Sequence, residues 1–377
     1  MTVKYMGSKR AMLGNGLGEL LIRERAGTER FVDLFTGSGS VAIYIARKYK
    51  IPVLAYDLQK YSVALAGAVI SRQAAVDWKP IWNLWHERAK NRLNTNGFPK
   101  AAKLTQAIVA DFREWCGSQK LPITKAYGGH YFSPKQAVWI DALRASLPDE
   151  PPEKTIALAS LIHAASESAA APGHTAQPLQ PTRTAKPFLK RAWDFDIVER
   201  TKKSLEQVSA QFARQIGSAQ VGDANEAATQ LRKGDLVFID TPYSGEHYSR
   251  FYHVLETIVN GECGEVSGVG RYPARDLRPK SRFSLKTESN AALDNLLETI
   301  AKQRAKAILT FPDHECSNGL SGETVREIAR KHFNVVEESV ESDFSTLGGT
   351  RTDEDGDETS RHPRQQAKEL MLVLKPK

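Results

Sequence analysis

The chain has 377 residues, of which 41% are hydrophobic and 25% charged, so it can bury one large hydrophobic core or two smaller ones. No apolar run approaches the roughly 18 residues needed to span a bilayer, and the first residues do not form the apolar stretch of a secretory signal. A cytoplasmic protein without membrane contacts is therefore expected. The formal net charge of +8 is compatible with a polyanionic partner but does not require one.

The first 72 residues show the alternating pattern of an α/β domain. An amphipathic helix is predicted over residues 11–25, followed by a strand at 31–35 that runs into a glycine turn. A helix over 40–48 leads to a short apolar strand at 52–56, which ends in Asp57. Strand, helix and strand would form one right-handed crossover unit of a parallel sheet.

Residues 73–217 interrupt this pattern and are predicted to be helical and rich in loops. Trp78, Trp82 and Trp85 share one helical face, a spacing typical of core packing. Ser133-Pro134 predicts a helix start, with the serine as N-cap and the proline in the first helical position.

Short apolar strands return after this segment. They are predicted at 219–221, 235–240, 307–311, 334–336 and 369–374. We therefore expect a Rossmann-like α/β sheet domain formed by residues 1–72 and 218–377, with the mainly helical segment 73–217 inserted between its strands. A helical module grafted into a cofactor-binding core is a common way to add substrate recognition.

The three cysteines, Cys116, Cys263 and Cys316, lie far apart and show none of the paired spacings that bind zinc. Their odd number argues against a disulfide framework. Reduced thiols and no metal site are therefore expected.

The glycine turn after the first strand predicts a cofactor site at the carboxyl edge of the sheet. Gly37 and Gly39 would let the backbone approach a ligand closely, ahead of a helix N-terminus. A Gly-x-Gly turn alone fits dinucleotide enzymes, methyltransferases and plain tight turns. The lack of a third glycine at the pyrophosphate spacing, and Asp33 placed where it could pair with an ammonium, favour S-adenosylmethionine (AdoMet). Asp57 ends the second strand, where a carboxylate can accept hydrogen bonds from ribose hydroxyls.

The segment Asp240-Thr241-Pro242-Tyr243 follows an apolar strand and should face the same edge. An exocyclic aromatic amine is a poor nucleophile because its lone pair is delocalised into the ring. The Asp240 carboxylate and the Thr241 carbonyl can accept its two N–H groups, while Pro242 stiffens the turn. Tyr243 offers a flat face to a base extruded from a duplex, and such stacking contributes about 1–3 kcal/mol per base. The motif predicts direct methyl transfer to an exocyclic amine, although standing alone it would also fit a turn that merely closes a strand.

The residues of these motifs and their order along the chain resemble those of the Dam-like class of adenine-N6 DNA methyltransferases. In that class the cofactor motif precedes the recognition insertion and the catalytic motif follows it. The resemblance implies AdoMet as cofactor, double-stranded DNA as substrate and a flipped-out adenine as target. Where this sequence has Thr241, the family usually has proline. Because the backbone carbonyl at this position is the acceptor, activity is expected to survive this departure.

Two further segments extend the resemblance. Residues 4–9 are similar to the family's N-terminal loop, which would place Tyr5 and Lys9 near the cofactor. The segment Val221-Gly222-Asp223 resembles the motif whose aspartate meets the adenine ring of AdoMet. The cofactor-binding residues implied in this way are Tyr5, Lys9, Asp33, Phe35, Gly37, Gly39, Asp57, Asp223 and Asp240.

The sequence leaves three functions open: an adenine-N6 DNA methyltransferase, an amino-methyltransferase acting on cytosine N4 or on RNA, and a DNA-binding subunit without catalysis. Asp240 favours adenine, because cytosine-N4 enzymes usually carry serine there. A restriction or defence partner is possible, and the oligomeric state is not predicted. Basic residues that could follow phosphates are Lys186, Lys190, Arg191, Arg271, Arg275, Arg278, Lys280 and Arg282.

Overall fold

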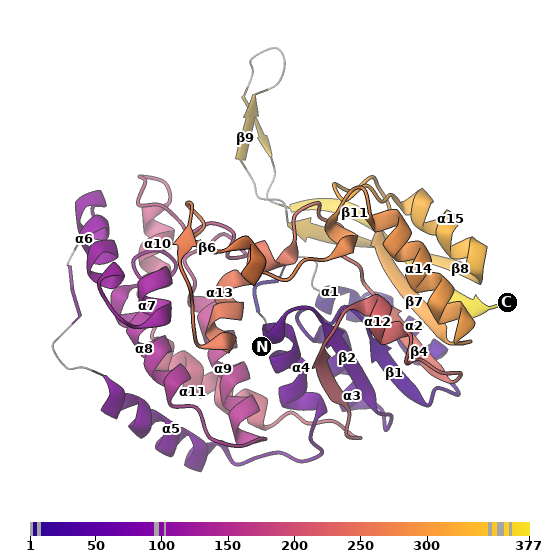
Figure 1. The fold of residues 1–377 in the computed structure, drawn as a ribbon, viewed down its shortest axis with the longest axis horizontal. Helices are drawn as coiled ribbons and strands as arrows, with labels where there is room; N and C mark the ends of the chain where they lie inside the picture. The colour runs from indigo at the N-terminus through magenta and orange to yellow at the C-terminus, as the bar shows by residue number, and fades with distance from the viewer. Residues whose placement is uncertain are drawn as a thin grey trace.

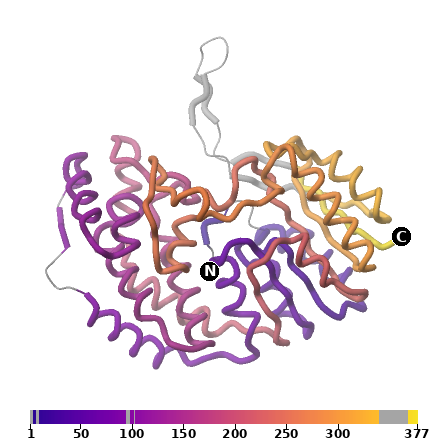
Figure 2. The backbone as a smooth tube through the Cα atoms, in the orientation of Figure 1, coloured from indigo at the N-terminus to yellow at the C-terminus, as the bar shows by residue number. Residues whose placement is uncertain are grey.

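The computed structural model describes residues 3–5, 9–93, 98–101, 103–345, 349–352, 358–361 and 364–377, with side chains outside 340–367. In this part of the chain, a seven-stranded sheet covered by helices lies beside a lobe of helices (Figure 1). The N-terminal segment runs between the sheet and the helical lobe (Figure 2). The expected α/β architecture with a mostly parallel sheet is confirmed.

The strand order brings the predicted motifs to one edge of the sheet. Five strands are parallel: β1 (Arg30–Asp33), β2 (Val53–Asp57), β3 (Ser218–Val221), β4 (Asp235–Ile239) and β7 (Lys306–Pro312). The long strand β11 (Arg364–Pro376) lies between β7 and β8 (Phe333–Ser345) and is antiparallel to both. In the order β3-β2-β1-β4-β7-β11-β8, the direction of strand addition reverses at β1 and β4. Ligands of such sheets bind near this point, at the carboxyl ends of the strands.

Helices cover both faces of the sheet, as the alternation of buried side chains along β1 requires. Phe31 belongs to the core under α2 (Leu17–Glu24), α3 (Ser40–Lys48) and α4 (Lys60–Ile70). Val32 points the other way, into the core under α12 (Ala224–Ala228), α14 (Ser289–Lys302) and α15 (Gly322–His332). Because both faces are covered, β4 is buried along its whole length, which explains its continuous apolar run.

Two predicted elements near the N-terminus differ from the structure. The helix expected over 11–25 is broken into α1 (Arg10–Leu13) and α2, because Gly16 adopts a φ of 85° that no α-helix accommodates. The first strand ends at Asp33, two residues earlier than predicted. The carboxylate of Asp33 accepts a hydrogen bond from the backbone N–H of Phe35, which turns the chain out of the sheet.

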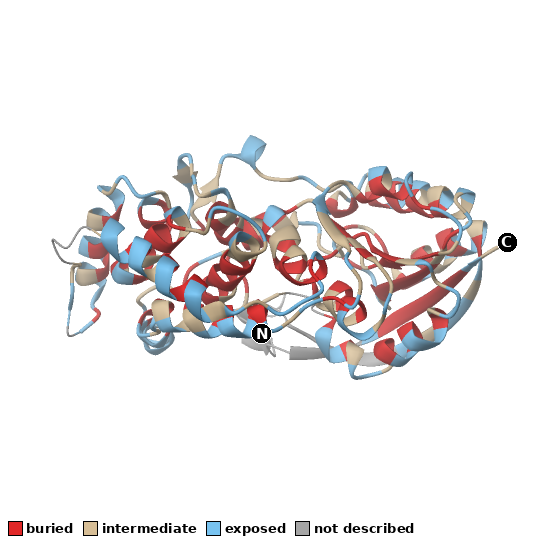
Figure 3. Cartoon of the chain, turned by 90° about the horizontal axis from the view of Figure 1, so that it is seen from below, coloured by how far each residue is buried: buried red, intermediate tan, exposed pale blue. Residues whose placement is uncertain are grey.

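The helices of the lobe pack around one hydrophobic core, and two helices of the sheet region also contribute side chains to it. Its helices are α5 (Trp78–Arg92), α6 (Gln106–Gly117), α7 (Pro122–Tyr127), α8 (Pro134–Ala145), α9 (Glu153–Ser168), α10 (Lys186–Trp193) and α11 (Ile197–Ser209). Trp82 and Trp85 are buried in this core, as their spacing predicted, whereas Trp78 is only partly buried against it. Side chains from α4 and from α13 (Tyr248–Asn260) belong to the same cluster. The lobe is therefore packed onto the sheet region through a shared core, and buried faces run through the lobe as they do under the sheet (Figure 3).

The predicted helix start at Ser133 is confirmed, and its cap is stronger than expected. The Ser133 hydroxyl accepts from the backbone N–H of Gln136, and the Gln136 side chain accepts from the backbone N–H of Ser133. This reciprocal capping box satisfies two N–H groups at the start of α8.

Short elements complete the described chain: β5 (Val266–Ser267), β6 (Tyr272–Pro273), η1 (Arg275–Leu277), η2 (Arg282–Ser284), β9 (Gly349–Thr352) and β10 (Glu358–Arg361). None of the described helices combines the length and apolar character required to cross a membrane.

Candidate functional site

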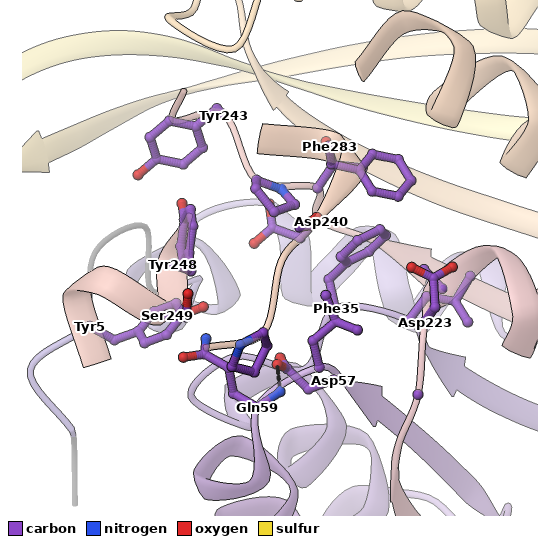
Figure 4. A pocket seen from close by; sticks show the side chains of 18 residues that line it. Tyr5, Phe35, Asp57, Gln59, Asp223, Asp240, Tyr243, Tyr248, Ser249 and Phe283 are labelled. Atoms are coloured by element: carbon purple, nitrogen blue, oxygen red, sulfur yellow. Dashed lines mark hydrogen bonds between the residues drawn. The ribbon is translucent and has the colours of Figure 1, made fainter. Parts of the chain in front are cut away.

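A pocket lies at the carboxyl ends of β1, β2 and β4 (Figure 4). Its wall includes Asp57, Asp223 and Asp240, together with aromatic side chains from several segments. Tyr5, Tyr243 and Tyr248 gather on one side of Asp240, whereas Phe35 and Phe283 lie on the other (Figure 4). The pocket therefore forms at the reversal point of the sheet, where the sequence placed both predicted motifs.

Asp57 is held at the pocket by the glycine turn. Its carboxylate accepts hydrogen bonds from the backbone N–H groups of Gly37 at 2.8 Å and Gln59 at 2.9 Å. Burial nevertheless raises the pKa of Asp57 to about 6. Gly37 has a φ of 52°, and a Cβ there would lie 2.6 Å from the Tyr5 hydroxyl oxygen. Only glycine lets Tyr5 and Asp57 approach the turn together.

Four residues of the predicted cofactor set do not line the pocket: Lys9, Asp33, Gly37 and Gly39. Asp33 is only 1% exposed behind the turn, and burial raises its pKa to about 8. Gly39 has a φ of 76° and packs α3 closely against Ala66 of α4. Asp33, Gly37 and Gly39 shape the glycine turn and Lys9 pairs with Asp240, whereas Tyr5, Phe35, Asp57, Asp223 and Asp240 line the pocket.

The pocket is acidic and aromatic. The described residues that line it include three aspartates but no lysine, arginine or histidine. Phe35 meets the edge of Phe283 with ring centroids 5.0 Å apart, and Tyr5 stacks on Tyr252 at 4.8 Å. The side-chain oxygen Oε1 of Gln59, also in the wall, is buried without a hydrogen-bond partner among the described residues. Such a wall suits a cationic ligand with an aromatic part and disfavours a pyrophosphate.

The tetrapeptide 240–243 leaves β4 and enters the pocket. The Oδ1 atom of Asp240 accepts a hydrogen bond from the Thr310 hydroxyl at 3.0 Å and pairs with the Lys9 ammonium at 2.9 Å. No hydrogen bond within the described part of the chain reaches Oδ2. Burial is the main reason that the pKa of Asp240 rises to about 6, and Lys9 opposes that rise.

The rest of the turn is fixed by a neighbouring loop. The side-chain amide of Asn318 donates to the carbonyls of Pro242 at 2.8 Å and Phe283 at 3.0 Å. Tyr243 meets the ring of Tyr248 edge-on, with centroids 6.4 Å apart. Burial raises the pKa of Tyr243 to about 12, so its phenol stays neutral. Thr241 is buried, and its hydroxyl has no hydrogen-bond partner among the described residues.

The sequence did not single out Thr310, Asn318 or Glu369, which contact the turn at 240–243 or Lys9. The Lys9 ammonium lies 2.5 Å from the Glu369 carboxylate as well as close to Asp240. Thr310 and Glu369 each carry a polar group within or beside an apolar strand, and that signal could have drawn attention to them. Asn318 lies in a loop, where a polar residue is unremarkable.

Comparison with known proteins gives a consistent result. The family model described as D12 class N6 adenine-specific DNA methyltransferase matches residues 5–112 and 181–306. The chain is 25% identical over 311 residues to the modification methylase StsI of Streptococcus sanguinis. The aligned region covers 79% of this chain and 42% of that protein. It is 24% identical over 308 residues to the type II methyltransferase M.FokI of Planomicrobium okeanokoites, covering 78% and 42% respectively. The modification methylase LlaI of Lactococcus lactis subsp. lactis is 24% identical over 79% of this chain and 44% of its own length. The chain thus spans less than half the length of these curated relatives.

Proposed function

Because this chain belongs to the D12 class of N6 adenine-specific DNA methyltransferases, we propose that it transfers a methyl group from AdoMet to the exocyclic N6 of adenine in double-stranded DNA. The observation that carries the proposal is the placement of the Asp240–Tyr243 turn in an acidic, aromatic pocket at the reversal point of the sheet. The names of the modification methylases support a role in a restriction-modification system.

The pocket residues fit AdoMet. AdoMet carries positive charge on its sulfonium and ammonium groups, and the described wall offers three carboxylates without a competing cation. Asp57 would hold the ribose hydroxyls and Asp223 the adenine ring, with Tyr5 and Phe35 packing beside them. Asp33, Gly37 and Gly39 would keep the turn in place, and Lys9 would act through Asp240. When bound, AdoMet supplies an electrophilic methyl group.

The catalytic turn would orient the target amine. With Oδ1 of Asp240 occupied by Lys9 and Thr310, Oδ2 is left to accept one N–H of the amine. The carbonyl of Thr241 would accept the other N–H. Together these bonds favour a tetrahedral nitrogen whose lone pair is not delocalised into the ring. Alignment of two bound reactants can supply about 7–11 kcal/mol. A general base accelerates a reaction by a factor of about 10²–10⁴, which corresponds to a smaller free energy. Positioning by this turn is therefore proposed as the main catalytic effect.

The base would reach the pocket by leaving the duplex. Tyr243 and Tyr248 lie on the side of Asp240 away from Phe35, so these two tyrosines would receive the base, whereas Phe35 would lie beside the cofactor (Figure 4). Stacking on Tyr243 would offset part of the few kcal/mol needed to extrude a base.

We also propose that the helical segment 73–217 contributes to target recognition and contacts the DNA backbone. Lys186 and Arg191 are exposed on α10, and Arg275 and Lys280 are exposed in the loop after β6. Two other predicted phosphate contacts have partners within the protein, because Lys190 pairs with Asp194 and Arg282 with Glu288. Arg271 donates to the carbonyl of Ala126. The ion pairs of the described chain involve none of Lys186, Arg191, Arg275 and Lys280, which are therefore the better candidates for phosphate contacts.

The test is incubation with labelled AdoMet and unmethylated DNA, followed by nucleoside digestion and mass spectrometry. We expect N6-methyladenine from the wild-type protein and no detectable turnover from Asp240→Ala, which should still bind AdoMet. N4-methylcytosine, or label only in RNA, would favour the alternative amino-methyltransferases. Binding of DNA and AdoMet without any methylated nucleoside would instead indicate a subunit without catalysis.

A further inference from the structure

Behind Asp240, on the side that does not line the pocket, three charged side chains meet. Lys9 comes from the N-terminal segment, Asp240 from the end of β4 and Glu369 from β11. The ammonium of Lys9 lies 2.9 Å from Asp240 and 2.5 Å from Glu369. The side chains of Lys9 and Glu369 are 5% and 10% exposed, so solvent screens these interactions only weakly.

The direction of β11 explains how Glu369 reaches this place. The parallel strands deliver their last residues to the catalytic edge of the sheet. β11 runs the opposite way, so Glu369 pairs with Pro312 at the end of β7. Thr310 on β7 and Asp240 after β4 lie at the same edge and are joined by a hydrogen bond.

The charges of this cluster do not balance. Among the described side chains of this cluster, one ammonium is shared by two carboxylates, which gives these three groups a net negative charge in a poorly solvated place. If Lys9 faced Asp240 alone, the pair would be neutral and Asp240 would be a weaker acceptor. A second carboxylate on the far side of Lys9 preserves negative charge on Asp240 while the ammonium keeps its position against Oδ1.

We propose that Glu369 is a positioning residue for methyl transfer: by sharing Lys9 with Asp240, it holds the catalytic carboxylate with Oδ2 toward the amine and maintains its strength as an acceptor. This inference rests on the proposed function of the same turn. Glu369 lies outside residues 5–112 and 181–306, the part of the chain that the family model matches. The pKa of Asp240 is consistent with this arrangement, since Lys9 lowers it and Glu369 raises it.

The test uses a substitution that removes the charge of the Glu369 side chain but keeps its shape. Glu369→Gln should lower kcat by about tenfold or more, the change that corresponds to one pKa unit of altered interaction. The KM values for AdoMet and DNA should stay within twofold, because Glu369 does not line the pocket. Glu369→Asp, which retains the charge, should recover part of the lost kcat.

A matched control is available at the other end of the sheet. The Glu24 side chain is 11% exposed, close to the 10% of Glu369, and it also pairs with a lysine, Lys306. Glu24→Gln should therefore remove a comparable buried charge and leave kcat unchanged. Equal kcat values for the two glutamine variants, with similar melting temperatures, would overturn the proposal in favour of a purely structural ion pair.

A second measurement does not depend on turnover. The carboxyl signal of Asp240, identified with Asp240→Asn, can be followed by NMR as a function of pH in the full chain without substrate. Glu369→Gln should move the Asp240 titration to lower pH, since a negative neighbour is removed, and the acidic limb of kcat should move in the same direction. In the described part of the chain, the titratable groups that face Asp240 are Lys9, Glu369, Tyr5, Tyr243, Tyr248 and Asp33, and all except Glu369 are unchanged in the comparison.

The two measurements separate the two levels of inference. If the wild-type protein methylates no adenine while the Asp240 titration moves as expected, the proposed function fails and the role of Glu369 in setting Asp240 stands. If the titration does not move, Glu369 does not tune Asp240, and the inference is overturned whatever the activity.

Discussion

Thr241 and Thr310 are two buried threonines beside the same carboxylate, and their hydroxyl groups are used differently. The Thr310 hydroxyl donates to Oδ1 of Asp240, whereas that of Thr241 has no hydrogen-bond partner among the described residues. A buried polar group without a partner costs about 1–3 kcal/mol. At position 241 the backbone carbonyl, not the side chain, is the group proposed to act on the amine.

Replacing each threonine by valine therefore has opposite expected results. Thr241→Val should raise the free energy of unfolding by about 1 kcal/mol, because an unpaired hydroxyl is removed, and should keep wild-type turnover. Thr310→Val removes a hydrogen bond to a charged group, which contributes about 1.5–3 kcal/mol, so turnover should fall roughly 10–100-fold. Denaturant unfolding and single-turnover kinetics measure the two effects. Loss of turnover in Thr241→Val would show that its side chain takes part in the reaction.

At the scale of single residues, the sequence could place the groups that follow strands, but not the groups that support them. Asp57 and Asp240 each end an apolar strand, so their position at the carboxyl edge follows from local pattern. The contact between Lys9 and Glu369 joins segments that are distant in the chain and depends on the register of β11. No local pattern carries that information.

At the scale of elements, α13 holds the start of α4. The side chain of Gln59, the N-cap of α4, makes no capping bond. Instead, the Glu256 carboxylate on α13 accepts from the backbone N–H groups of Lys60 and Tyr61, both at 3.1 Å. The helix that follows the catalytic turn thus caps the helix that follows the strand of Asp57. These bonds connect the two halves of the pocket.

Loss of this cap should destabilise the protein without removing a pocket residue. Glu256→Ala is expected to lower the free energy of unfolding by about 1–2 kcal/mol, the usual cost of losing an N-terminal cap. Glu262→Ala, at an exposed position just after α13, should change it by less than about 0.5 kcal/mol. Thermal or urea unfolding of both variants tests this expectation. Equal stabilities would mean that water replaces the carboxylate at no cost.

The elements themselves were largely predictable, and the exceptions have physical causes. Strands β2, β4 and β7 and helix α3 follow from apolar runs and helical periodicity. The break before α2 depends on the backbone conformation of Gly16, since an isolated glycine is tolerated inside many helices. The insertion of β11 between β7 and β8 depends on pairing partners, which hydrophobic pattern does not specify.

At the scale of the molecule, the sheet region and the helical lobe are joined by one packed core. Tyr61 of α4 and Val254 of α13 belong to the same cluster as Trp85 of α5. The Arg144 guanidinium on α8 also donates to the carbonyls of Ile258 and Val259 near the end of α13. The insertion of a helical segment between strands was predicted from sequence, but the sharing of α4 and α13 was not. Both helices look in sequence like ordinary partners of the sheet.

This shared core predicts that both regions unfold together. All six tryptophans lie between residues 78 and 193, so tryptophan fluorescence reports only on the helical lobe. Far-UV circular dichroism reports on the whole chain. We expect the two signals to give the same midpoint and slope in urea, as in a single cooperative transition. An earlier fluorescence transition would indicate that the lobe is an independent module.

The antiparallel entry of β11 into the sheet also has a consequence for biosynthesis. Asp240 leaves the ribosome well before Glu369, and a nascent chain without β11 lacks the second carboxylate that pairs with Lys9 and the strand that separates β7 from β8. In such a chain the glycine turn and the turn at 240–243 have already been synthesised, but the Asp240 carboxylate does not yet have the surroundings that β11 supplies. The proposed methylation should therefore begin only after β11 has been translated and docked.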